Sequence, residues 1–173
     1  MSELVVRSFT ADDEAQARTA HAELAAEGFD FCLGLEQSGT WSAWLDHLVE
    51  IERGRDLPPG WVPETFVGGF AGGTLVGRLS VRHRLNAHLA HVGGHIGYAV
   101  RPGHRRRGRA SALLRHGLLV ARGVGLERVL VTCTDTNVAS ARTIEGAGGE
   151  LEDVVVVPGT GELKRRYWIA THG

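Results

Sequence analysis

The chain has 173 residues, of which 43% are hydrophobic and 23% charged, and these proportions predict one folded domain spanning residues 1–173. Its 19 lysine and arginine residues nearly balance 20 aspartate and glutamate residues, and a net charge of −1 argues against a nucleic-acid partner. The sequence shows no apolar run long enough for a membrane span and no signal peptide, so we expect a cytoplasmic protein without a membrane partner.

The first elements predicted from the sequence are a strand and a helix. Residues 4–9 are rich in β-forming side chains and predict a short strand. Thr10, followed three residues later by Asp13, resembles a capping box, and the helix that it starts is expected to run to about Glu27.

A second helix is predicted over residues 40–53, where Trp41 and Trp44 begin an apolar stripe at helical spacing. This tryptophan pair is typical of core packing, with the lining of a substrate pocket as the alternative. A proline-rich segment follows and predicts a loop, because proline does not fit the interior of a helix or strand. Beyond this loop, strands are expected over residues 64–70, 75–84 and 91–100.

The second half of the chain continues with alternating helices and strands. The expected elements are a helix over residues 108–123, a strand over 128–134, a helix capped by Asn137, and an antiparallel pair over 151–157 and 162–170. The element order β-α-α-β-β-β-α-β-α-β-β predicts an α/β fold, a mixed sheet with helices on both faces. Its strand–helix–strand units favour some parallel neighbours.

Cysteine and histidine give no sign of a disulfide or a metal centre. Cys32 and Cys133 are too few for a disulfide scaffold and are interpreted as buried structural residues. The nine histidines are scattered and form no metal-binding motif, so no metal is expected.

The strongest chemical signal is a basic segment at a predicted helix start. Four arginines cluster there: Arg105, Arg106, Arg107 and Arg109. The first N–H groups of a helix have no intrahelical partner, and the small residues Gly108 and Ala110 would let a phosphate approach them. A P-loop and a dinucleotide fingerprint are both absent from this segment. A solvated basic helix start, or an incidental nucleic-acid patch, is the alternative.

This segment also resembles a known family. Arg105-x-x-Gly108-x-Ala110 is similar to the R/Q-x-x-G-x-G/A signature of the GNAT N-acetyltransferase superfamily, and residues 135–140 resemble a later block of that family. The resemblance covers nearly the whole chain and implies the GNAT-like acyl-CoA N-acyltransferase fold. Two further segments, Gly-Gly-His-Ile-Gly-Tyr ending at Tyr98 and Arg-Tyr-Trp-Ile ending at Ile169, resemble a bacterial subgroup of predicted acetyltransferases.

The resemblance implies an acetyl-CoA-dependent N-acetyltransferase. Such an enzyme would transfer the acetyl group of its co-substrate acetyl-CoA to a primary amine of a small molecule or protein by direct attack. Acidic residues near the first helix, among them Glu23, Glu27 and Asp30, would suit a cationic amine, although a charged, solvated face is the commoner explanation. The family often forms homodimers. The alternative is a non-catalytic acyl-CoA-binding or sensing module of the same fold.

The resemblance also implies roles for individual residues. Backbone N–H groups from Arg105 to Ala110 would hold the CoA pyrophosphate. The main chain at Ala99 and Val100 would bind the pantetheine arm and polarise the thioester carbonyl, between strands that splay apart. Asn137 and Ser140 would contact the cofactor as well, and a helix cap is the simpler role for Asn137.

One position departs from the family pattern. In the family, a tyrosine often lies seven residues after the asparagine of that block, where it can protonate the departing thiolate. In this chain the asparagine is Asn137, and Ile144 occupies the position of the tyrosine. Loss of this acid would slow the reaction without preventing it, because a thiol is a reasonable leaving group. Water, Ser140 or Tyr98 could take its place.

The general base is expected on the strand that carries the oxyanion donor. His95 lies five residues before Val100, and an imidazole with a pKa near 6.5 suits proton removal from an amine. A histidine held by hydrogen bonds within the sheet is the alternative. Glu27 and His83 are the other candidates for this base.

Overall fold

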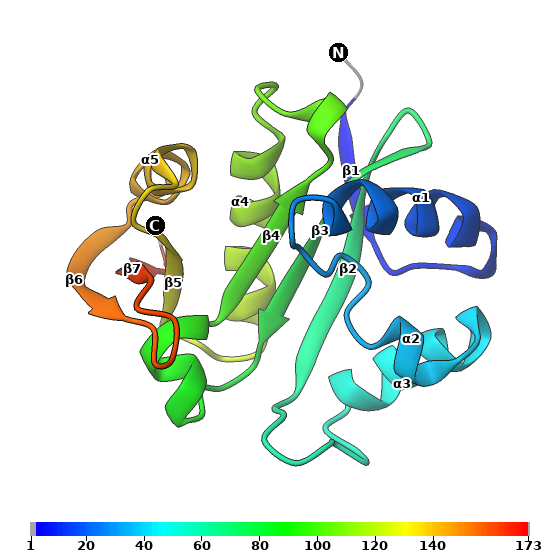
Figure 1. Ribbon diagram of the computed structural model, residues 1–173, viewed down its shortest axis with the longest axis horizontal. Coiled ribbons are helices and arrows are strands. Elements are labelled where there is room, and N and C mark those ends of the chain that lie inside the picture. Colours follow the sequence, from blue (N-terminus) through cyan, green and yellow to red (C-terminus); the bar gives the residue numbers. More distant parts are fainter. Residues whose placement is uncertain (1–2, 173) are drawn as a thin grey trace.

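The computed structural model describes residues 3–172, and its longer elements follow the predicted order (Figure 1). No helix among these residues is both long and apolar enough to cross a membrane. The helices are α1 (Glu14–Ala25), α2 (Leu35–Ser38), α3 (Trp41–Glu52), α4 (Arg109–Gly123) and α5 (Val138–Glu145). The strands are β1 (Leu4–Arg7), β2 (Glu64–Ala71), β3 (Thr74–Arg82), β4 (Ile96–Val100), β5 (Arg128–Thr134), β6 (Glu150–Val156) and β7 (Leu163–Ala170).

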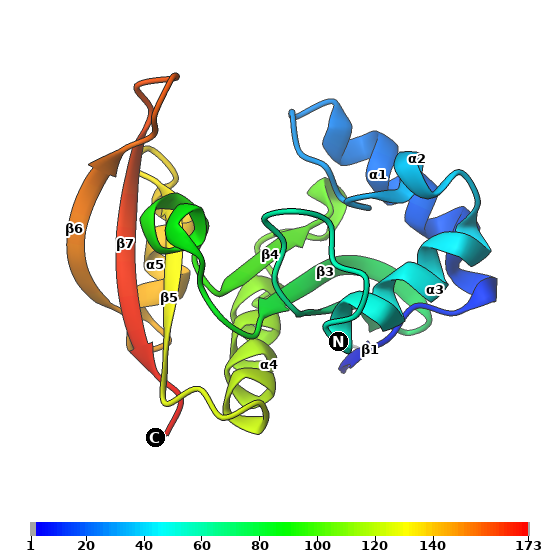
Figure 2. The same ribbon diagram turned by 90° about the horizontal axis from the view of Figure 1, so that it is seen from below.

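The strands form two sheets, one of four strands in the order β1-β2-β3-β4 and one of three in the order β5-β7-β6. Figure 2 shows α4 on one side of the four-stranded sheet and α1 to α3 on the other, with the three-stranded sheet and α5 standing beside them. The predicted α/β class is therefore confirmed. All the described ladders are antiparallel. The parallel neighbours expected from the strand–helix–strand unit, β4 and β5, are not joined in a ladder within residues 3–172.

The strand expected from residue 91 begins instead at Ile96, because a π-helical turn occupies Leu89–Gly93. The N–H of Gly94 closes this turn on the carbonyl five residues earlier, at 2.7 Å. Gly94 has a φ of +67°, and a Cβ added there would lie 2.6 Å from the main-chain oxygen of Leu130. Glycine thus permits a close approach between the start of β4 and β5, which periodicity alone did not predict.

Alternation along β3 separates the two faces of the four-stranded sheet. Leu79 and Val81 point toward α4, in a core that also contains Ile96 and Leu113. The other face packs against α1 and α3 through a second, aromatic-rich core. Its large buried residues are Phe9, Phe31, Trp41, Trp44, Phe66 and Phe70.

Both tryptophans of α3 belong to this second core. Trp41 is 5% exposed and Trp44 is fully buried, so the prediction of core packing is confirmed. Each indole N–H finds a main-chain acceptor at 3.0 Å, the oxygen of Thr10 for Trp41 and that of Leu33 for Trp44. Satisfied donors of this kind are what a buried indole requires.

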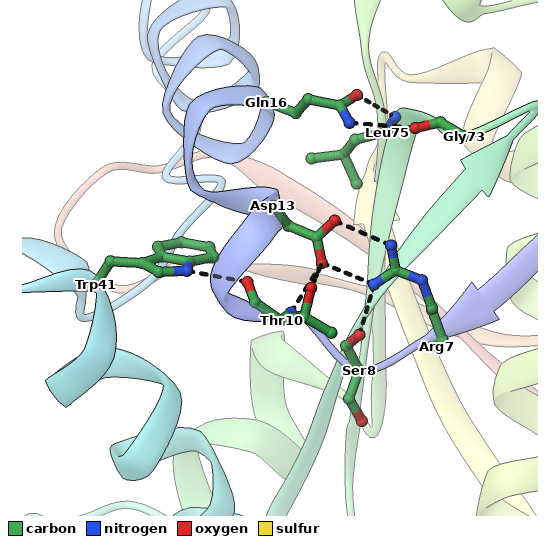
Figure 3. Close-up of polar contacts among 8 residues, drawn as sticks. All are labelled: Arg7, Ser8, Thr10, Asp13, Gln16, Trp41, Gly73 and Leu75. Atoms are coloured by element: carbon green, nitrogen blue, oxygen red, sulfur yellow. Dashed lines mark hydrogen bonds and ion pairs between the residues drawn. The ribbon is translucent and has the colours of Figure 1, made fainter.

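The start of α1 is fixed to the sheet by polar contacts (Figure 3). The buried carboxylate of Asp13 accepts hydrogen bonds from both terminal nitrogens of Arg7, at 2.7 and 2.9 Å, and from the main-chain N–H of Thr10 at 2.8 Å. The predicted helix start at Thr10 and Asp13 is confirmed. One turn later, Gln16 bonds the β2–β3 turn, accepting from the N–H of Leu75 at 2.8 Å.

Candidate active site

The strands β4 and β5 meet at one end and diverge toward the other (Figure 2). At the narrow end, the main-chain N–H of His95 donates to the oxygen of Leu130 at 2.7 Å, and the N–H of Leu130 donates to Nδ1 of His95 at 2.8 Å. Along its other edge, β4 is paired with β3 in an antiparallel ladder. The edge of β4 that faces β5 is therefore available for a ligand.

The hydrogen bonds to β3 decide which main-chain groups of β4 lie on this free edge. The N–H of Arg101, just after β4, donates to the oxygen of Val76 at 2.9 Å. Alternation along an antiparallel pair then directs the main chain of Ala99 toward β3, and that of Tyr98 and Val100 toward β5. Of the two main-chain positions predicted to bind the pantetheine arm, Val100 presents its N–H to the opening, whereas the groups of Ala99 belong to the β3 ladder.

The helix α4 begins at the wide end of this opening. Its N-cap, Gly108, has a φ of +72°, and Arg106 also adopts a left-handed φ of +60°, which is rare for a residue other than glycine. The N–H groups of the first turn, including that of Ala110, have no intrahelical acceptor and lie at the positive end of the helix dipole. The segment predicted to hold a phosphate thus has the backbone geometry for this role.

Two ion pairs tie α1 and the turn that follows it to this segment. The guanidinium of Arg101 donates to both carboxylate oxygens of Glu23, at 2.6 and 2.8 Å. Arg105 donates to both oxygens of Glu27, at 3.1 and 2.6 Å, and its Nε donates to the oxygen of Val100 at 3.0 Å. The side chain of Arg105 is therefore already engaged, and it positions the segment through these contacts.

The same contacts bear on Glu27, one of the predicted candidates for the general base. Its carboxylate is exposed, and the hydrogen bonds from Arg105 hold its pKa below the usual range. A carboxylate with a lowered pKa is a weaker proton acceptor. The base role of Glu27 stays a prediction, and this geometry favours a structural role.

His95 is 5% exposed and has both a structural bond and a lowered pKa. Because its Nδ1 accepts from the N–H of Leu130, the neutral ring must carry its proton on Nε2 and has no free lone pair. Burial lowers the pKa of His95 to about 4. These observations favour the sheet-bonded alternative, and the assignment of His95 as general base stays a prediction without support from this geometry.

The third candidate for the base, His83, lies at the far end of β3. Its Nε2 is 2.9 Å from Oγ1 of Thr65, which in turn donates to a carboxylate oxygen of Glu52 at 2.7 Å. Burial lowers the pKa of His83. This chain of hydrogen bonds links β2, β3 and the end of α3.

Tyr98 connects β4 to α5 across the divergence of the strands. Its hydroxyl lies 3.0 Å from Oγ of Ser140, and burial raises the pKa of Tyr98, so that the phenol stays protonated at neutral pH. Asn137 caps α5, since its side-chain oxygen accepts from the N–H of Ser140 at 3.0 Å, which confirms the predicted cap. Ile144 is fully buried in the core and leaves no acid at its position.

A polar strip on the opposite face of the sheet was missed by the sequence analysis. It consists of Glu64 on β2 and of Arg78, Ser80 and Arg82 on β3, and it faces α1 to α3. Arg78 and Ser80 are at least nine-tenths buried, as is Glu64. The sequence carries a signal for this strip, because these three residues of β3 alternate with apolar ones. That alternation predicts a strand with one polar face, but it does not predict that the polar face is buried.

The remaining polar residues do not form a metal centre. Within residues 3–172, no group of three or more histidine, cysteine, aspartate or glutamate side chains is placed to hold a metal ion. Both cysteines are free and buried, and burial raises the pKa of the Cys32 thiol to about 12. Neither thiol is therefore activated as a nucleophile.

Comparisons with known proteins agree with this geometry. The family model described as the acetyltransferase (GNAT) family matches residues 33–148. No curated protein matches the sequence. Among solved structures, the RimJ protein of Mycobacterium smegmatis in complex with CoA-disulfide superposes with a TM-score of 0.70 at 19% identity, covering 96% of this chain and 81% of that one.

Two further structures share the fold. A GNAT-family acetyltransferase from Streptococcus pneumoniae has a TM-score of 0.68 at 16% identity, covering 97% of this chain and 99% of that one. The yncA protein of Salmonella typhimurium, solved with its cofactor acetyl-CoA, has a TM-score of 0.62 at 14% identity, covering 97% of this chain and 94% of that one.

Proposed function

This chain is a member of the GNAT acetyltransferase family, and we propose that it is an acetyl-CoA-dependent N-acetyltransferase that acts on a primary amine. The observation that carries this proposal is the position of the α4 N-terminus at the wide end of the β4–β5 opening. The helix start offers main-chain donors to the phosphate groups of a long phosphorylated thioester, and the free strand edge offers them to its thioester end.

The residues present fit acetyl-CoA. When bound, acetyl-CoA supplies the acetyl group, whose carbonyl carbon bonds to the amine nitrogen while its bond to sulfur breaks. The N–H groups of residues 105–110 would hold the pyrophosphate, and Gly108 allows the close approach. Arg106 and Arg107 are exposed beside this point and add positive charge.

On the free edge of β4, the N–H of Val100 would donate to the thioester oxygen and stabilise the negative charge that develops there. Tyr98 would protonate the departing sulfur. Its hydroxyl lies beside α5, the helix on which the family often carries its tyrosine, and its raised pKa keeps the proton available. The proton lost by the amine balances the one that Tyr98 gives, so the products are the amide and the CoA thiol.

Acetyl-CoA binding is tested first by calorimetry with Gly108→Val and a matched control. A valine at a φ of +72° strains the backbone at the helix start and blocks the approach of phosphate, and we expect about a hundredfold loss of affinity. Gly103→Val, a few residues earlier and at a position without a positive φ, should bind normally. Equal affinities for the two variants would contradict the proposed phosphate site.

Activity is tested by thiol release from acetyl-CoA in the presence of primary amines. The alternative of a non-catalytic acyl-CoA-binding module predicts that acetyl-CoA binds but that no amine accelerates thiol release. A primary amine that does so, with the acetylated amine identified by mass spectrometry, supports the enzyme.

A further inference from the structure

The polar strip contains an unusual concentration of buried groups without hydrogen-bond partners. Oε1 of Glu64, Nε of Arg78 and Oγ of Ser80 are all buried and unpaired within the described part of the chain. A buried polar atom without a partner is costly, so such atoms are rare and call for an explanation. All three lie on one face of β2 and β3, and of the three Glu64 also lines a pocket, where a ligand can supply the missing partner.

The strip borders a pocket of about 330 Å³. Glu64 and Arg82 both line it, together with the apolar side chains of Leu33, Trp61 and Leu89. The carboxylate of Glu64 is 9% exposed, and its nearest cationic atom is Nε of Arg82, at 4.0 Å. That separation is too long for a hydrogen bond, so the two opposite charges lie side by side at the pocket without satisfying each other.

The same strip leads from the pocket to β4. Gly97 is opposite Ser80 in the register of the sheet. A Cβ added to Gly97 would lie 3.3 Å from Oγ of Ser80, 3.8 Å from Nη1 of Arg82 and 3.9 Å from Nη1 of Arg78. The polar side chains therefore surround Gly97, the residue before Tyr98 on β4. In this way the strip connects the pocket to β4, the strand that would hold the thioester.

We propose that this pocket binds the acceptor, and that the acceptor is a zwitterionic amine of the amino-acid type with an apolar side chain. In this arrangement the ammonium donates to the carboxylate of Glu64, and the anionic group of the acceptor pairs with Arg82. The apolar part of the acceptor packs against Leu33, Trp61 and Leu89. This inference rests on the proposed function and specifies its substrate class.

Charge complementarity selects the zwitterion over a simple amine. A cationic amine without an anionic group would be attracted by Glu64 but repelled by the guanidinium groups of Arg78 and Arg82. Removing one of two opposite partners from a buried site leaves the other charge uncompensated, which is costly. A zwitterion supplies both signs at the spacing of one carbon atom, and a volume of about 330 Å³ accommodates a molecule of that size.

The experiment compares amino acids with the amines that lack their carboxylate. The pairs are leucine with isoamylamine, methionine with 3-(methylthio)propylamine, and phenylalanine with phenethylamine. Thiol release from acetyl-CoA gives kcat/KM for each acceptor, and we expect the best amino acid to exceed its amine by about tenfold or more. Ligand-observed NMR measures binding of the same compounds to the free protein, independently of turnover.

The test variant is Glu64→Gln, which keeps the shape of the side chain and removes its charge. We expect about a tenfold rise in the KM of the amino acid, with the affinity for acetyl-CoA unchanged. Glu150→Gln is the control, because Glu150 is exposed on β6 and does not line the pocket. This variant should retain the wild-type KM.

The outcomes separate the inference from the proposed function. If the wild type acetylates the simple amines as well as the amino acids, or if Glu64→Gln changes neither KM nor binding, the acceptor inference is wrong and the enzyme assignment stands. If no amino acid of the panel either reacts or binds, the inference is also wrong. Failure of the wild type to bind acetyl-CoA would instead overturn the proposed function.

Discussion

The two faces of the four-stranded sheet are built from the same strands but bury different side chains. One face buries apolar side chains, and the other also buries polar atoms that lack hydrogen-bond partners. On the face toward α4, Leu79 and Val81 of β3 pack into an apolar core. On the other face the intervening residues are Arg78, Ser80 and Arg82, and two of the three have a buried polar atom without a partner. Neighbouring residues of β3 thus differ in role: one set packs in an apolar core, and the other holds buried polar atoms.

This difference shows where the fold gains stability and where it retains binding capacity. A well-packed apolar face contributes through the area that it removes from water. A face with unpaired polar atoms gives up part of that contribution, and such sites are where a ligand can supply the missing partners. The following predictions test this division, beginning with the change of largest expected effect.

The apolar face is tested by Leu79→Ala. Leu79 is fully buried against α4, where Gly117 allows the helix to approach so closely that an added Cβ would lie 3.1 Å from Leu79. We expect the variant to lower the free energy of unfolding by about 2–5 kcal/mol, because it leaves a cavity in a rigid core. Urea denaturation measures this loss. A decrease below about 1 kcal/mol would show that this face is not the main source of stability.

The second prediction concerns a buried acid that is fully paired, in contrast to Glu64. The hydrogen bonds from Arg7, followed by those from Thr10, hold the pKa of Asp13 below its usual value (Figure 3). Asp13→Asn should therefore lower the free energy of unfolding at neutral pH by about 1.5–3 kcal/mol, the range for hydrogen bonds to a charged group.

The pH dependence of this loss has a defined sign. A carboxylate with a lowered folded-state pKa stabilises the protein above its unfolded-state pKa of about 3.9, and this contribution disappears as the pH falls through the folded-state value. The difference between wild type and Asp13→Asn should thus shrink as the pH falls below about 4. Asp12→Asn, at the exposed neighbouring position, is the control and should change the free energy of unfolding at neutral pH by less than about 0.5 kcal/mol.

How much of this arrangement is predictable from the sequence depends on the range of the contacts involved. The phosphate segment is local, so a glycine before a helical period suffices to place Gly108 at the start of α4. The ion pair between Arg105 and Glu27 joins residues 78 positions apart, and no periodicity predicts it. The predicted start of β4 at residue 91 was wrong for a similar reason. The backbone at Gly94 lies close to that of Leu130, a contact between residues far apart in the sequence.

The polar strip lies between these cases. The alternation of Arg78, Ser80 and Arg82 predicts that they share one face of a strand, but not whether that face is solvated. Their burial follows from the aromatic core beneath α1 and α3, which includes Phe66. Phe66 also lies under the guanidinium of Arg78, at 5.0 Å from its ring centre. Such burial is a property of the tertiary structure.

The third prediction concerns Tyr98, which brings a hydroxyl to the edge of the apolar face. Tyr98→Phe removes the proposed acid while keeping the ring, and we expect kcat to fall by about tenfold to a hundredfold with little change in KM. Because burial raises the pKa of Tyr98, the wild-type kcat should not decline on the alkaline side before the ordinary tyrosine pKa of about 10 is reached. Ser140→Ala, which removes only the hydrogen-bond partner, is the milder control. An unchanged kcat in Tyr98→Phe would exclude this acid.

The smallest effect on the free energy of unfolding is expected for Ser80→Ala. Ser80 is next to Leu79, where the largest effect is expected. Ser80 is fully buried and its hydroxyl has no partner, so its removal relieves a desolvation cost and leaves little empty space. The free energy of unfolding should change by less than about 0.5 kcal/mol, or rise. Thr132→Val is the matched case, because the Thr132 hydroxyl donates to the oxygen of Val92 at 2.8 Å and its loss should cost about 1 kcal/mol. If Ser80→Ala were the more damaging of the two, the hydroxyl would already be satisfied in the free protein, and the contrast between the two faces of the sheet would not hold.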